Sequence, residues 1–277
     1  MLARANASLR DSVNAALTEA MRDGTLERIF RRWQVWDDTQ GALFAQVLRS
    51  PGAQRTATAT APVQPLAYLP ALLRAAGVTA LVSVLAMALA VIVGLLVAAG
   101  RVYGSAPVRW LTACYVELVR GTPVLLQLFV IYYGLVGFVR LPALLAAVLG
   151  LGLNYAAYEA EIYRGALEAV ARAQLEAART LGFSEGQILR LIRGPQALRY
   201  ALAPMTNDFV ALLKDSSLVS VITVVELTKQ TQIFATNIGS WVIPGALCAA
   251  LYLAMSLPLS QLARRLESYW ATGTDSR

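Results

Sequence analysis

The sequence predicts an all-α integral membrane protein with five membrane-spanning helices. Of its 277 residues, 57% are hydrophobic and 15% are charged, whereas an average soluble domain has about 25% charged residues. The apolar residues are concentrated in long uncharged runs, which are typical of membrane spans and not of a large soluble core. The net charge of +7 comes largely from arginines between these runs, so membrane topology explains it better than nucleic-acid binding.

The positions of the apolar runs define the predicted spans. The first, residues 77–100, carries no charged side chain and is long enough to cross roughly 30 Å of hydrocarbon. The fourth is marginal, because Asp208, Lys214 and Asp215 lie inside it. The five predicted spans are residues 77–100, 110–139, 142–163, 200–225 and 239–262.

The distribution of arginine predicts the orientation. The loop at 101–109, the long segment at 164–199 and the tail at 264–265 are rich in arginine and fall on one side of the predicted membrane. By the positive-inside rule this side is cytoplasmic, so the C-terminus is expected in the cytoplasm and the N-terminus outside the inner (plasma) membrane. The predicted parts are an extracytoplasmic helical fragment at 1–48, a Pro/Ala/Thr-rich linker at 49–66 and a transmembrane domain at 67–270.

Several kinds of chemistry are excluded by the residues that the sequence lacks. It contains no histidine, which excludes His-based triads and HExxH zinc sites. Neither lysine follows a glycine, so there is no Walker A motif with which the chain could hydrolyse ATP itself. No catalytic residue, no metal site and no cofactor is therefore predicted.

The segment 168–195 predicts two short helices joined by a glycine turn. Charged residues at i,i+4 spacing favour a solvated first helix. Gly182 can end this helix in a left-handed cap, and Ser184 with Gln187 can form the capping box of the second helix. This second helix is expected to end at Gly194-Pro195. On spacing alone, an amphipathic connector lying on the lipid surface is an equal alternative.

The residue order of this segment is more informative than its spacing. Residues 176–182 read EAARTLG and are followed by PQAL at 195–198, a pattern that resembles the EAA loop of ABC importer permeases. Three further motifs resemble the polar amino acid permeases of that group, the histidine/glutamine/arginine type. They are YVELVRGTP at 115–123, EIYRGA at 161–166 and LKDSSL at 213–218.

The resemblance implies a five-span permease subunit with a cytoplasmic coupling helix. Its implied partners are a separate ABC ATPase that binds the ATP, a second permease subunit in a homo- or heterodimer, an extracellular amino-acid-binding protein and the lipid bilayer. The chain departs from the family's usual apolar pair before the motif's proline, because it has Arg193 and Gly194 there, and this leaves the fit to the ATPase open. The implied ATPase-coupling residues are Glu176, Ala177, Ala178, Gly182 and Ser184.

Two charged pairs lie at predicted membrane depth, where ionisable groups are costly. Glu117 and Arg120 are three residues apart and are expected to form a structural pair, just before Thr122-Pro123 opens the helix toward a cavity. Glu161 has two interpretations of equal weight. It either meets a substrate ammonium in a polar cavity or pairs with Arg164 at the interface.

The substrate pathway is predicted along one face of the third span. Asn154, Tyr158 and Glu161 share this face by their i, i+4 and i+7 spacing. Lys214 and Asp215 interrupt the fourth span and are expected to contribute to gating, because broken helices in membranes line cavities.

Residues 9–36 resemble the C-terminal helices of extracellular amino-acid-binding proteins. They are too few to rebuild a two-lobed binding domain, so the fragment is expected to be a remnant, or the sequence starts inside a longer gene. An amphipathic helix pair without an inherited role is the alternative.

For the whole chain, the rival hypothesis is a secondary transporter of small polar solutes, which gives no reason for the EAA segment. A membrane enzyme is disfavoured by the missing catalytic motifs.

Overall fold

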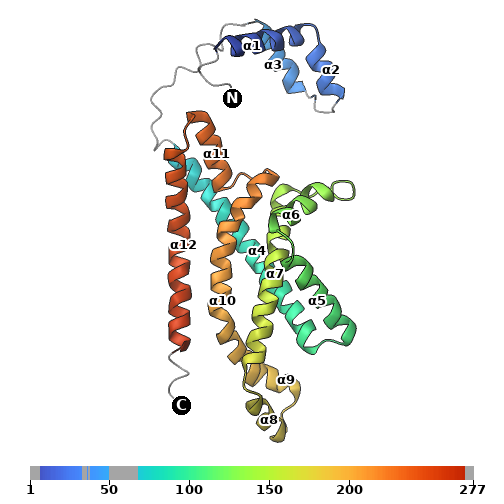
Figure 1. The fold of residues 1–277 in the computed structure, drawn as a ribbon, viewed down its shortest axis with the longest axis vertical. Helices are drawn as coiled ribbons and strands as arrows, with labels where there is room; N and C mark the ends of the chain where they lie inside the picture. Colours follow the sequence, from blue (N-terminus) through green and yellow to red (C-terminus); the bar gives the residue numbers. More distant parts are fainter. Residues whose placement is uncertain (1–6, 33–35, 37, 50–67, 272–277) are drawn as a thin grey trace. The chain divides into compact units, whose positions relative to one another are not determined.

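The computed structural model describes residues 7–32, 36, 38–49 and 68–271, and the chain divides into two compact units, Met1–Val63 and Gln64–Arg277. Every regular element in these ranges is a helix (Figure 1), which confirms the all-α prediction. The predicted linker at 49–66 lies outside the described residues, apart from Arg49 at the end of a helix.

The N-terminal unit consists of α1 (Ala7–Arg22), α2 (Thr25–Arg32) and α3 (Asp38–Arg49). Gly24 between the first two helices has φ +75°, a backbone conformation that glycine adopts at little cost. Phe44 is 9% exposed and packs against Phe30 and Trp36, with ring centroids 6.3 Å and 5.4 Å away. This small aromatic cluster is the core of the unit, because its helices are otherwise largely exposed.

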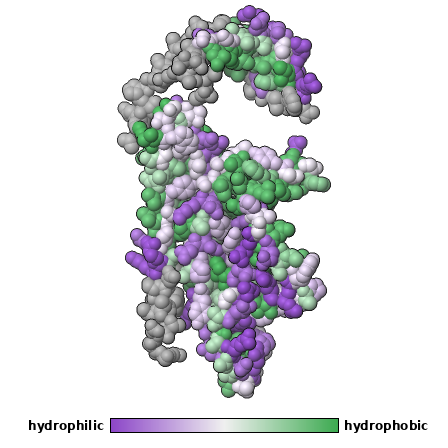
Figure 2. All heavy atoms as spheres, in the orientation of Figure 1, coloured by the Kyte–Doolittle hydropathy of each residue, from purple (hydrophilic) through white to green (hydrophobic). Residues whose placement is uncertain are grey.

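The membrane unit is built around four long helices, α4 (Leu69–Tyr103), α7 (Ala143–Ala169), α10 (Gly194–Asp215) and α12 (Val242–Ala271). The short helices α8 (Arg172–Thr180) and α9 (Glu185–Ile188) lie at one end of this unit, and α11 (Leu227–Ile238) lies at the other (Figure 1). Apolar side chains cover the surface of α6 (Val124–Phe129) and the π-helical η3 (Val130–Gly134), as Figure 2 shows. Such a surface suits contact with lipid or another membrane protein.

Three helices among the described residues are long and apolar enough to cross a membrane, and a fourth span is possible if a bent pair counts as one. The three are α4, α7 and the Val242–Arg265 part of α12. The bent pair is α5 (Ala106–Arg120) with α6 and η3, which turns by 103° within the predicted second span. Because the charged α10 is not among these helices, the count of five spans stays a prediction.

The core of the membrane unit is the close contact between α4 and α7. A Cβ atom added to Gly94 of α4 would lie 2.7 Å from Cβ of Glu159 and 3.1 Å from the carbonyl oxygen of Ala156. A Cβ atom added to Gly152 of α7 would lie 2.7 Å from Cδ2 of Leu89. Small residues thus allow the two backbones to approach each other closely, as is common for membrane helices.

The helix α11 falls in a segment for which the sequence predicted only a short connection. Glu226 caps its N-terminus, because the fully buried carboxylate accepts hydrogen bonds from the backbone N–H groups of Thr228 (2.8 Å) and Lys229 (2.7 Å). The hydroxyl of Tyr252 in α12 donates to the same carboxylate (3.1 Å). The cap and the contacts with α4 and α12 therefore stabilise this helix, which buries the face formed by Leu227, Thr231, Phe234 and Ala235.

The α4–α7 contact predicts that Gly94→Ala destabilises the protein by about 1–3 kcal/mol, because the methyl group has no space between the two backbones. Gly77→Ala in the same helix is the matched control, since nothing lies within 4 Å of the added atom. The midpoint of thermal unfolding in detergent should fall for the first variant alone. Equal midpoints for the two variants would contradict the proposed packing.

Candidate functional site

The break between α5 and α6 is stabilised by polar side chains. Gln127 donates from Nε2 to the carbonyl oxygens of Val119 (2.8 Å) and Thr122 (3.2 Å), two acceptors that the break leaves without helical partners. The Thr122 hydroxyl donates to the carbonyl oxygen of Leu118 at 2.9 Å. Asn154 of α7 donates from Nδ2 to Oε1 of Gln127 (3.1 Å), so the break is joined to the central helix. Irregular backbone at membrane depth requires such partners.

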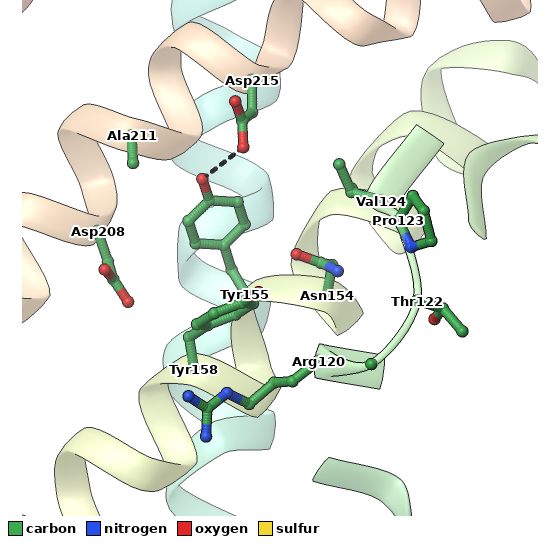
Figure 3. A pocket seen from close by; sticks show the side chains of 11 residues that line it. Arg120, Thr122, Pro123, Val124, Asn154, Tyr155, Tyr158, Asp208, Ala211 and Asp215 are labelled. Atoms are coloured by element: carbon green, nitrogen blue, oxygen red, sulfur yellow. Dashed lines mark hydrogen bonds between the residues drawn. The ribbon is translucent and has the colours of Figure 1, made fainter. Parts of the chain in front are cut away.

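A pocket of about 490 Å³ lies where this break meets α7 and α10 (Figure 3). Its walls come from three segments that are far apart in the sequence. The lining residues are Arg120, Gly121, Thr122, Pro123 and Val124 from the break, Asn154, Tyr155 and Tyr158 from α7, and Asp208, Ala211 and Asp215 from α10.

The pocket carries one guanidinium group and two carboxylates. The guanidinium of Arg120 lies 5.2 Å from the centre of the Tyr158 ring, a cation–π arrangement. Asp215 accepts a hydrogen bond from the Tyr155 hydroxyl at 2.8 Å, whereas the buried Oδ2 of Asp208 has no hydrogen-bond partner among the described residues. Opposite charges around one small pocket can hold a zwitterion, with the carboxylate of the ligand at the guanidinium of Arg120 and its ammonium at Oδ2 of Asp208.

Of the residues predicted for the pathway, Asn154, Tyr158 and Asp215 line this pocket, whereas Glu161 and Lys214 do not. Glu161 forms ion pairs with Arg164 (2.8 Å) and with Arg101 of α4, which agrees with the expected pairing to Arg164. The seven residues from Asn154 to Glu161 span about 10 Å along a helix, which takes Glu161 out of the pocket although it shares the face. Lys214 is exposed.

The structure does not bring Glu117 and Arg120 together. No ion pair joins them in the described part of the chain, and Arg120 lies over Tyr158 in the pocket instead. The helix ends directly at Arg120, so the side chain can turn toward α7. The i,i+3 spacing alone did not account for an aromatic partner on another helix.

Asp208 and Tyr155 also line the pocket, although neither was predicted for the pathway. Asp208 and Asp215 are seven residues apart and therefore share one face of α10, which is a pattern that could have been found. Tyr155 lies three residues before Tyr158 and borders the predicted face of α7, but its hydrogen bond to Asp215 depends on packing between α7 and α10. The role of Arg120 likewise depends on packing between helices.

At the end of the membrane unit opposite α11, the helices α8 and α9 and the turn between them form a knob, residues 172–188. The N–H of Phe183 donates to the carbonyl of Ala178 (3.1 Å) and the N–H of Gly182 to that of Arg179 (3.0 Å), a Schellman motif. Gly182 has φ +85°, and Ser184 and Gln187 form a capping box, so both features predicted for this turn are confirmed. The arrangement fixes the angle between the two short helices.

The knob presents a mostly hydrophilic surface (Figure 2) around an apolar tip. Arg179 and Glu185 pair across the turn at 2.6 Å, and this contact lowers the pKa of Glu185. At the tip, Leu181 is 78% exposed and Phe183 is 37% exposed, although neither is among the predicted coupling residues. Of the five predicted coupling residues, Glu176, Ala177, Gly182 and Ser184 are exposed, whereas Ala178 is buried within the knob.

The prediction that a helix ends at Gly194-Pro195 is wrong. The chain continues from α9 through a π-helical turn, η4 (Leu189–Arg193), directly into α10. The N–H of Gly194 donates to the carbonyl of Leu189, five residues back, and a Cβ atom on Gly194 would lie 2.6 Å from that oxygen. The wider turn accommodates Pro195, which lacks the N–H for an α-helical bond, and Gly194 fits the crowded position.

Comparison with known proteins identifies a family. Residues 90–270 match the family described as binding-protein-dependent transport system inner membrane component. The chain is 37% identical over 203 residues to the glutamine transport system permease protein GlnP of Escherichia coli, which covers 72% of this chain and 92% of that protein. It is 35% identical over 195 residues to the L-cystine transport system permease protein TcyB of Bacillus subtilis, covering 68% and 83%.

Solved structures agree with this relationship. The crystal structure of an amino acid ABC transporter with histidines contains a chain that is 35% identical, with a TM-score of 0.70 and coverage of 74% of this chain and 96% of that one. The MetNI methionine ABC transporter, at 19% identity and a TM-score of 0.56, covers 73% of this chain and 98% of its own. The second similarity supports the fold alone.

Proposed function

Because the chain belongs to the family of binding-protein-dependent transport system inner membrane components, we propose that it is the permease subunit of an ABC importer for polar amino acids. Members of this family work with an ATPase subunit and another permease subunit. ATP is hydrolysed by the partner ATPase, and the chain itself is not an enzyme.

The observation that carries the proposal for the pathway is the zwitterionic character of the pocket. A buried carboxylate oxygen without a partner at membrane depth is costly, and an ammonium group of a substrate would satisfy it. Asp208 is therefore assigned to the substrate ammonium and Arg120 to its carboxylate. Asp215, held by Tyr155, and Asn154, held by Gln127, shape the walls around the rest of the molecule.

Transport requires the pocket to open alternately to the two sides of the membrane. The pocket lies at a broken helix, and its walls belong to three separate segments that can move relative to one another. The tightly packed α4 and α7 are expected to move as one body, since their contact tolerates little sliding. Arg120 lies over Tyr158 of α7, so movement of this body relative to α10 changes the distance between Arg120 and Asp208 and thereby releases the substrate.

The knob is proposed as the coupling contact with the ATPase, through Glu176, Ala177, Gly182 and Ser184, while the buried Ala178 supports it from within. Its fixed turn can transmit a rigid-body movement of the ATPase, and its exposed apolar tip can enter a cleft of that partner. We further propose that the N-terminus lies outside the cell and that an extracellular amino-acid-binding protein delivers the substrate. Two permease subunits are proposed to form the pathway as a dimer.

Exchange of Asp208 for asparagine tests the assignment of the pocket. The full complex in proteoliposomes should take up radiolabelled L-glutamine, L-histidine or L-arginine, and Asp208→Asn should raise the KM of uptake about tenfold, because it removes a charge-assisted contact. Glu117→Gln is the matched control, since this exposed carboxylate does not line the pocket. An unchanged KM in Asp208→Asn would contradict the assignment.

The coupling contact is tested by co-purification with the ATPase. Gly182→Asp should abolish recovery of the ATPase, because any side chain at φ +85° strains the turn by about 1–2 kcal/mol and this one adds a charge at the contact. Gly186→Asp is the control, as position 186 has an ordinary φ and open space in the same knob. Recovery of equal amounts with both variants would place the contact elsewhere.

The orientation is tested by cysteine labelling of intact cells. In a background without Cys114 and Cys248, Gln46→Cys should react with a membrane-impermeant maleimide, because the positive-inside rule predicts an external N-terminal unit. Ser184→Cys in the knob should react only after the cells are permeabilised. The reverse pattern would overturn the proposed topology.

A further inference from the structure

Arg193 occupies the junction between the knob and the membrane helices. It is the last residue of η4, so it follows the knob and directly precedes α10. Its guanidinium donates from Nε to the carbonyl of Leu167 (2.9 Å) and from Nη1 to the hydroxyl of Tyr103 (3.0 Å). It also lies 5.6 Å from the centre of the Tyr103 ring. One side chain at the start of α10 thus contacts two other long helices.

Both contacts are made at helix ends. Leu167 is among the last four residues of α7, whose carbonyl groups have no partner within the helix, and a positive charge there also suits the helix dipole. Tyr103 is the last residue of α4. Arg193 therefore caps α7 and holds the end of α4 through the same planar group, a geometry that a lysine cannot reproduce.

The position of Arg193 connects the knob to the pocket. α7 carries Asn154, Tyr155 and Tyr158, and α4 packs against it too closely for the two helices to move independently. A hydrogen bond between the side chains of Gln196 and Gln174 (2.9 Å) joins α10 to α8 of the knob. A displacement of the knob therefore reaches the pocket-lining helix through the contacts of Arg193, in addition to the two-residue link between α7 and α8.

We propose that Arg193 is a positioning residue that transmits movement of the knob to α4 and α7, so that ATP hydrolysis by the partner changes the shape of the pocket. This role rests on the proposed importer function. It also explains why a charged residue is present directly before the glycine and proline of the segment: the side chain is directed to the ends of α4 and α7, where its partners lie.

The test is the number of amino acid molecules taken up for each ATP hydrolysed. The full complex is reconstituted in proteoliposomes with the binding protein outside, and the probe is whichever of L-glutamine, L-histidine and L-arginine the wild type accumulates. Arg193→Leu should reduce this ratio about tenfold, since two hydrogen bonds of a charged group are lost, while the ATPase is still recovered and hydrolyses ATP. Arg190→Leu, an exposed residue of the same η4, should leave the ratio unchanged.

A double-mutant cycle separates transmission from structural support. Tyr103→Phe should lower the ratio moderately, because it removes the hydroxyl and keeps the ring, and it should have no further effect when combined with Arg193→Leu. Compared with Arg193→Leu, Arg193→Lys should recover part of the ratio of uptake to ATP hydrolysis through a single contact.

An unchanged ratio in Arg193→Leu, or a parallel loss of thermal stability, ATPase recovery and uptake, would overturn the proposal. A wild-type complex without ATP-driven uptake would instead refute the importer function itself.

Discussion

A membrane interior offers no water to unpaired backbone groups, and this constraint shapes the centre of the molecule. Where the chain turns by 103° between α5 and α6, carbonyl groups lose their helical partners. Gln127 replaces those partners, and its own oxygen accepts a hydrogen bond from Asn154 of α7. The break is therefore fastened to the central helix, and the pocket exists because the broken helix, α7 and α10 meet at this point.

The close approach of α4 and α7 is the second constraint on which the pocket depends. Glycines at 94 and 152 bring the two backbones together, so that both helices form one rigid support for the pocket-lining side chains of α7. The same pair of helices ends beside Arg193, next to the knob. The pocket and the proposed ATPase contact are thus connected through stiff elements, which is what a transporter driven from one side requires.

Much of the fold could be predicted from local patterns in the sequence. Long apolar runs predict α4, α7 and α12, and the cap residues Gly182 and Ser184 predict the turn of the knob, because each depends on neighbours within a few residues. The helix α11 was not predicted in this way, because it depends on partners in other helices: Thr79 of α4 accepts a hydrogen bond from the Leu227 N–H, and Tyr252 of α12 donates to the capping carboxylate of Glu226. The π-turn before Gly194 was missed because Gly-Pro ordinarily ends a helix.

The sequence by itself determined that the chain is an all-α membrane protein with a segment that resembles an EAA loop, because hydropathy and the order of motif residues are properties of consecutive residues. It also identified Asn154, Tyr158 and Asp215, which line the pocket. Only the tertiary structure decided that Glu161 pairs with both Arg101 and Arg164. It also decided that Arg120 contacts the Tyr158 ring and not Glu117, and that Asp208 lines the same pocket as Arg120. A charged side chain in a low-dielectric interior interacts with whichever group the packing brings near, and that group is often distant in sequence.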